Sequence, residues 1–117
     1  MRRGLFVVAA LVACGGPSAD VPGETADTGG PCVDAPVATW ENFGAGFVTQ
    51  HCQACHAGSA PDRHGAPDDV RFDSREETEA LAERVLARVV DAGDMPPSGG
   101  VSADDLAMVG YWLACSE

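Results

Sequence analysis

Five cysteines in a chain of 117 residues constrain this sequence more than any other feature. Two of them belong to a C-x-x-C-H motif that runs from Cys52 to His56. Another, Cys14, follows an apolar run near the N-terminus, while Cys32 and Cys115 stand far apart in the rest of the chain. Cysteines at such spacings serve covalent attachment, metal binding or disulfides. The cysteines therefore divide the chain into parts with different chemistry.

The N-terminal part has the pattern of a secretory signal. Two arginines follow Met1, and nine apolar residues extend from Leu5 to Ala13, directly before Cys14. That run is too short to cross a bilayer, which takes about 20 residues in a helix. Its Leu-Val-Ala-Cys end resembles the lipobox of bacterial lipoproteins, which implies cleavage before Cys14 and lipid on that cysteine. Ordinary cleavage, with Cys14 incidental, is the alternative. We therefore expect a signal peptide over residues 1–13 and an exported, membrane-anchored protein that faces the periplasm or the cell exterior.

Residues 14–31 are rich in glycine and proline and contain no aromatic residue. Such a segment cannot bury enough apolar surface to offset the entropy of ordering it. We expect a flexible tether that follows the lipid anchor. The whole chain has 7 Lys+Arg against 18 Asp+Glu, a net charge of −11. That balance argues against nucleic-acid binding, which needs a basic face.

Residues 32–117 predict one small all-α domain. Thr39 is placed to cap a first helix that ends near the C-x-x-C-H motif. Ser74 begins a second helix with a capping box and an apolar stripe, which Gly93 ends, and Ser102 begins a third. No segment alternates with period two over a useful length, so no strand is expected.

The C-x-x-C-H motif on an exported chain is typical of covalent haem attachment. The thiols of Cys52 and Cys55 can add to the two vinyl groups of one haem. The adjoining His56 is then held where its ring nitrogen can ligate the iron. This pattern predicts one haem c per chain.

Three other interpretations of the motif stay open. A thioredoxin-like dithiol is disfavoured, because no βαβ pattern surrounds the cysteines. The two thiols could form half of a zinc site that His64 or His51 and Cys32 complete. They could also form a plain structural disulfide.

From Trp40 to Leu113 the sequence resembles the small class I c-type cytochromes. The attachment motif matches, and Gly44 stands eight residues before the first motif cysteine, where the family has its helix-crossing glycine. Four residues before that cysteine, Val48 replaces the aromatic residue usual in the family, and Trp112 matches the packing aromatic of the last helix. The resemblance implies a bundle of three to five helices around one haem. It also implies that a backbone carbonyl of the segment at Pro67 fixes the axial histidine.

Met95-Pro96-Pro97, after the Gly93 turn, looks like the loop that carries the distal ligand in this family. A methionine beside two prolines is poorly placed to fill a core, and the prolines stiffen the loop. We therefore expect Met95 as the sixth ligand. Met108 on the last helix is the rival, and His51 and His64 are weaker ones.

The remaining cysteines and arginines have expected roles as well. Spare cysteines usually pair in an oxidising compartment. The first and last helices of the resembled fold lie together, which makes a Cys32–Cys115 disulfide sensible. Arg63 and Arg71 are candidates for pairing with haem propionates, with a solvated arginine as the alternative.

These expectations combine into a function. Ligation by His56 and Met95 leaves the iron no open position, and methionine favours the reduced state. We expect an electron-transfer protein, not an enzyme, whose redox partners carry basic docking surfaces. A haem enzyme or ligand sensor with an open sixth position is one alternative. A binding module without haem, stabilised by zinc or disulfides, is the other.

Overall fold

The computed structural model of the protein describes Gly30 and residues 32–115. The expected signal peptide, the Cys14 anchor and nearly all of the expected tether lie outside these residues. Within them, no helix is both long and apolar enough to cross a membrane.

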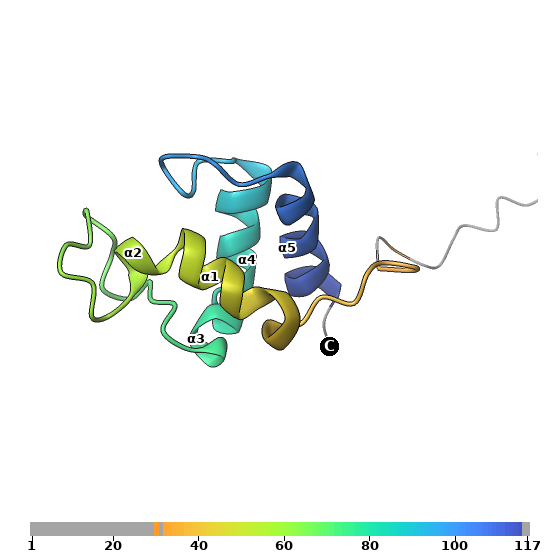
Figure 1. Cartoon of the computed structure of the whole chain (residues 1–117), viewed down its shortest axis with the longest axis horizontal. Helices are drawn as coiled ribbons and strands as arrows, with labels where there is room; N and C mark the ends of the chain where they lie inside the picture. Colours follow the sequence, from red (N-terminus) through yellow and green to blue (C-terminus); the bar gives the residue numbers. More distant parts are fainter. Residues whose placement is uncertain (1–29, 31, 116–117) are drawn as a thin grey trace, which may run out of the picture.

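Seven helical segments make up the described domain, and no strand occurs in that part of the chain (Figure 1). The all-α class is therefore confirmed. The segments follow in the order η1 (Trp40–Gly44), α1 (Ala45–His51), α2 (Gln53–His56), α3 (Arg75–Ala80), α4 (Ala82–Val85), η2 (Leu86–Asp91) and α5 (Ala103–Cys115). The two η segments have π-helical hydrogen bonding.

The first helical run begins where the sequence predicts. The hydroxyl of Thr39 accepts from the backbone N–H of Asn42 at 3.2 Å, and the Asn42 side chain accepts from the Thr39 N–H at 2.7 Å. These two bonds form a capping box that satisfies two free donors at the start of η1. The run continues through α1 and changes direction at Cys52, where φ is −118°. The C-x-x-C-H motif therefore lies at a bend between two helices.

The second helical run begins at its predicted cap but is not continuous. The Ser74 hydroxyl accepts from the N–H of Glu77 at 3.2 Å, while the Glu77 carboxylate accepts from the N–H of Asp73 at 3.0 Å. A capping box would have the Glu77 carboxylate accept from the N–H of Ser74, so the observed bond lies one residue earlier than expected. A single helix from Ser74 to Gly93 is wrong, because Leu81 leaves helical geometry at φ −106° and ψ 15°. The run then resumes as α4 and η2.

Two of the predicted turns and caps in the C-terminal half are present. Gly93 has a φ of 63°, in the left-handed region that glycine occupies without strain, and it lies just beyond η2. The Ser102 hydroxyl accepts from the N–H of Asp105 at 3.1 Å and caps α5.

The core centres on Trp112 of α5, which is fully buried. A Cβ at Gly44 would lie 2.6 Å from Cζ2 of Trp112, so η1 and α5 approach as closely as a glycine allows. The rings of Trp40 and Phe43 lie 5.9 Å and 6.2 Å from Trp112. Val48 is also buried beside them. The predicted close crossing at Gly44 is confirmed.

A disulfide joins Cys32 to Cys115, with a Cα–Cα distance of 5.3 Å. It connects the segment before η1 to the end of α5, as expected of the two spare cysteines. The pairing leaves Cys52 and Cys55 as the free thiols of the described chain.

Candidate functional site

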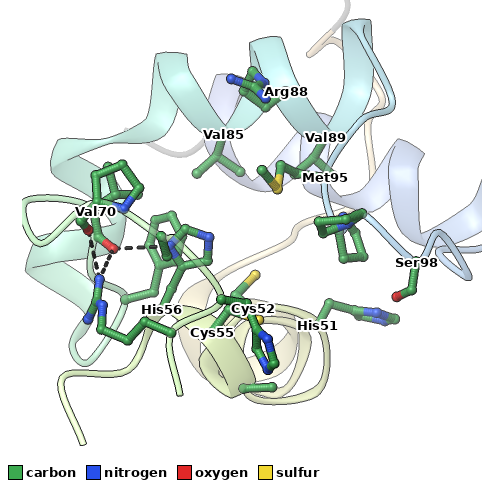
Figure 2. Close-up of a pocket in the computed structure, with 18 of the residues that line it drawn as sticks. His51, Cys52, Cys55, His56, Val70, Val85, Arg88, Val89, Met95 and Ser98 are labelled. Carbon is green, nitrogen blue, oxygen red and sulfur yellow. Dashed lines mark hydrogen bonds between the residues drawn. The ribbon is translucent and has the colours of Figure 1, made fainter. Parts of the chain in front are cut away.

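A cavity of about 490 Å³ lies between the helices of the motif and the α4–η2 run (Figure 2). Its volume is in the range of roughly 300–1,000 Å³ usual for small-molecule sites. Every residue predicted to hold the cofactor lines it. These are Cys52, Cys55, His56, Pro67 and Met95. The cavity also lies against buried apolar side chains, namely Phe47, Val70, Phe72, Val85 and Val89.

Cys52 and Cys55 lie on the side of the cavity opposite Met95 (Figure 2). Both cysteines line this cavity, because residues three positions apart in a helical segment lie on the same face. Burial raises the pKa of the Cys52 thiol to about 12. This thiol therefore stays protonated and uncharged near neutral pH, as its largely apolar surroundings require.

The ring of His56 is fixed by a backbone carbonyl. Nδ1 lies 3.0 Å from the carbonyl oxygen of Val70, and the ring packs 5.1 Å from that of Phe72. A carbonyl can only accept, so Nδ1 carries the hydrogen, and in the neutral ring Nε2 is the nitrogen with the lone pair. The bond therefore selects the tautomer in which Nε2 can ligate a metal ion.

The carbonyl that fixes the histidine is not the one expected from the proline segment. Val70 supplies it, three residues beyond Pro67. Pro67 lines the cavity, and its own carbonyl accepts from the guanidinium of Arg63 at 2.7 Å. The reason is local, since a turn in which the Val70 N–H donates to the Pro67 carbonyl at 3.0 Å brings the later carbonyl to the ring.

Arg63 is bound to the protein backbone. Its guanidinium donates to the carbonyls of Ala57, Pro67 and Val70 at 3.1, 2.7 and 3.1 Å. The side chain is only 17% exposed. Arg71 donates to a carbonyl of the same loop at 3.0 Å and does not line the cavity. Arg63 is therefore not the solvated arginine of the alternative interpretation, whereas Arg71 is exposed as that interpretation expects. Pairing of either arginine with haem propionates stays a prediction.

Met95 lies on the opposite wall, beside Val85 and Val89 (Figure 2). Two bonds to the carbonyl of Arg88 hold its loop, one from the N–H of Asp94 at 3.0 Å and one from the N–H of Met95 at 3.3 Å. The Arg88 side chain also donates to the Asp94 carboxylate at 2.7 Å. This hydrogen bond lowers the pKa of Asp94 and raises that of Arg88. The rival, Met108, packs on the core from α5 and is not part of the cavity wall.

The two rival histidines also line the cavity. The ring of His51 is partly buried, and its centroid lies 4.8 Å from that of Phe47. His64 is exposed in a turn at φ 49°, where its N–H donates to the Asp62 side chain at 2.8 Å.

Charge is unevenly distributed around the cavity. No aspartate or glutamate of the described chain lines it, although the protein carries a net charge of −11. Its charged lining consists of Arg63, Arg84 and Arg88. Sequence reasoning missed Arg84 and Arg88, because their place on the helix face opposite the motif depends on how the two halves pack. The lining itself therefore contributes positive charge, part of which Asp94 balances through its bond to Arg88.

Among Gly30 and residues 32–115, no group of three or more histidine, cysteine, aspartate or glutamate side chains is placed to hold a metal ion. No protein-family model, curated protein or solved structure matches the chain.

Proposed function

We propose that the chain is a mono-haem c-type cytochrome that transfers single electrons outside the cytoplasm. One observation carries the proposal. The two thiols and the imidazole of the C-x-x-C-H motif face the same cavity as the thioether of Met95, which lies 39 positions after His56 in the sequence. Thioether links to Cys52 and Cys55, with His56 and Met95 as axial ligands, would use every one of these groups.

The residues present fit a haem. The cavity has buried aliphatic and aromatic walls, which suit a flat apolar macrocycle. Its charged lining is cationic, which suits the two carboxylates of the macrocycle. The uncharged Cys52 thiol and the free Nε2 of His56 are the chemical forms that attachment and ligation start from.

When bound, haem supplies an iron that changes oxidation state by one electron. The protein's own groups decide how that iron behaves. The Val70 carbonyl orients His56, the hydrogen bonds to Arg88 hold the Met95 loop, and the buried Val85 and Val89 keep water from the Met95 wall. Ligation by both His56 and Met95 would leave the metal no open position for a substrate, which favours a carrier over an enzyme.

The proposed location and partners rest on the sequence. The signal-like residues 1–13 and the lipobox cysteine Cys14 support export and anchoring in a membrane. A net charge of −11 supports docking to redox proteins with basic surfaces, since opposite charges speed encounter.

The haem is tested by producing the full chain in a host that attaches haem c, and extracting the denatured protein with acidified organic solvent. We expect the colour to stay with the polypeptide in the native chain. A Cys52→Ser, Cys55→Ser double variant should release it. Colour that leaves the native polypeptide, or no colour at all, would refute covalent attachment.

The axial ligand is tested with matched variants of two methionines. The oxidised protein should show the weak near-infrared sulfur-to-iron band, and Met95→Ala should abolish it. Met108→Ala should keep the band and only loosen packing. Rapid binding of carbon monoxide by the native ferrous protein would instead support a ligand sensor with an open position.

A further inference from the structure

The loop after the C-x-x-C-H motif folds around the side chain of Arg63. His64 and Gly65 both have positive φ, 49° and 81°, and the N–H of Ala66 donates back to the Arg63 carbonyl at 2.8 Å. This turn reverses the chain, so that the carbonyl of Pro67 comes to the guanidinium of Arg63. An arginine in an acidic loop would ordinarily extend into solvent.

The burial of Arg63 carries an energetic cost. Its Nε is buried without a hydrogen-bond partner in the described structure, and the Asp68 carboxylate is 3.9 Å away. Burying such a donor unpaired is unfavourable. The other two guanidinium nitrogens offset that cost by donating three hydrogen bonds to carbonyls. These bonds keep the side chain in its buried position.

The Val70 carbonyl links Arg63 to His56. It accepts from Nη2 of Arg63 at 3.1 Å and from Nδ1 of His56 at 3.0 Å. A carbonyl oxygen has two lone pairs, and this one uses one for each donor. Figure 2 shows the Val70 carbonyl beside the imidazole of His56 at one edge of the cavity, and Nη2 of Arg63 lies 3.1 Å from the same oxygen. A shift of the guanidinium therefore shifts the oxygen that orients the ring.

We propose that Arg63 is a positioning residue, which fixes the Val70 carbonyl so that His56 presents Nε2 to the cavity. The assignment of Nε2 as an iron ligand rests on the proposed function, but the hydrogen-bond relay itself does not. The relay needs a planar fork, because three carbonyls in different directions share one head group. Lysine keeps the charge but carries all its donors on one nitrogen, so it should not reach the carbonyls that Nη1 and Nη2 of arginine reach together.

Arg71 offers a matched control in the same loop. Its Nε donates to one backbone carbonyl, that of Asp68, at 3.0 Å, and it makes no bond to Val70. Arg71→Lys changes the same chemistry as Arg63→Lys at a site that does not reach His56.

The experiment follows the hydrogen on Nδ1 of His56 by NMR in the full chain labelled with 15N-histidine. The protein is used as isolated from the haem-attaching host, in its reduced form if it carries haem. Exchange of this hydrogen with solvent is compared with exchange of the α5 amides, which report general loosening. We expect a protected hydrogen in the native protein and at least about tenfold faster exchange in Arg63→Lys and in Arg63→Gln. The α5 amides and Arg71→Lys should be unchanged.

Each outcome decides the proposal, independently of haem. An unprotected Nδ1 hydrogen in the native protein overturns the relay without any variant. So does equal protection in the Arg63 variants, or a rise in α5 exchange by the same factor, which would make the arginine merely structural. If the protein carries haem but the Nδ1 hydrogen shows no dependence on Arg63, the relay is refuted and the proposed function is not. If the Nδ1 hydrogen is protected in the expected pattern but the protein carries no haem, the relay is supported and the proposed cytochrome function is refuted.

Discussion

Replacing Gly44 with alanine should destabilise the domain, although alanine is the better helix former. The added Cβ would meet three atoms of the Trp112 ring at 2.6, 2.7 and 3.0 Å. Contacts this short force the tryptophan to move, but it is fully buried and packs against the rings of Trp40 and Phe43. Overpacking of this kind costs about 1–3 kcal/mol.

Alanine gains up to about 1 kcal/mol over glycine in a helix, which offsets part of that cost. With the full gain subtracted, the free energy of unfolding should be lower by up to about 2 kcal/mol, or the Tm lower by up to about 15 °C for a domain of this size. Gly46→Ala is the control, because a Cβ added there would meet no other atom within 4 Å and the site is exposed. That variant should be as stable as the native chain or up to about 1 kcal/mol more stable.

Urea unfolding followed by far-UV circular dichroism measures both effects. A double-mutant cycle makes the test sharper. The three ring atoms at Gly44 belong to the six-membered part of the indole, so Trp112→Phe should relieve the overlap. The double variant should then be more stable than the sum of the single effects predicts. If Gly44→Ala matches Gly46→Ala in stability, the close approach of η1 and α5 is wrong.

Three further predictions follow from other parts of the structure. In haem-free protein carrying Cys55→Ser, iodoacetamide at pH 8 should alkylate Cys52 of the folded chain at least about a hundredfold more slowly than Cys52 of the chain unfolded in urea. The reason is that burial raises the pKa of the thiol to about 12 and only the thiolate reacts. Equal rates would contradict the burial. Replacing Cys32 and Cys115 by serine should lower the free energy of unfolding by roughly 4 kcal/mol in the loop-entropy model, measured in urea, and an unchanged midpoint would contradict it. Asp94→Asn should weaken the bond from Arg88 that helps to fix the loop carrying Met95. Reduced, haem-loaded protein should then bind carbon monoxide faster in stopped flow, while its Tm hardly changes. Unchanged binding would show that backbone hydrogen bonds alone fix this loop.

Several features of the fold were predictable because they depend on local chemistry. The caps at Thr39, Ser74 and Ser102 need only a hydroxyl and a free N–H two or three residues on. The close crossing at Gly44 was predictable because a missing side chain marks where another helix can approach. The break at Leu81 was not, since leucine favours helix and nothing in the local sequence opposes continuation.

The cavity also contains residues that could be predicted from the sequence and residues that could not. The motif and the Met95 loop were identified from side chains whose types are rare elsewhere in the sequence. The carbonyl of Val70 could not be identified from the sequence, because every residue has a carbonyl and only the folded turn places this one at the His56 ring. The role of Arg63 was missed for the same reason, since its partners are three backbone oxygens.

The disulfide between Cys32 and Cys115 also determines how the domain responds to mechanical load. It joins positions 83 apart in sequence, before the first helix and at the end of the last. A pull on the chain through segments outside these two cysteines would pass across the covalent bridge and leave the helices between them unloaded. Tension on the oxidised protein should therefore stretch only what lies outside the bridge, and reduction would make the cavity itself part of the force-bearing path.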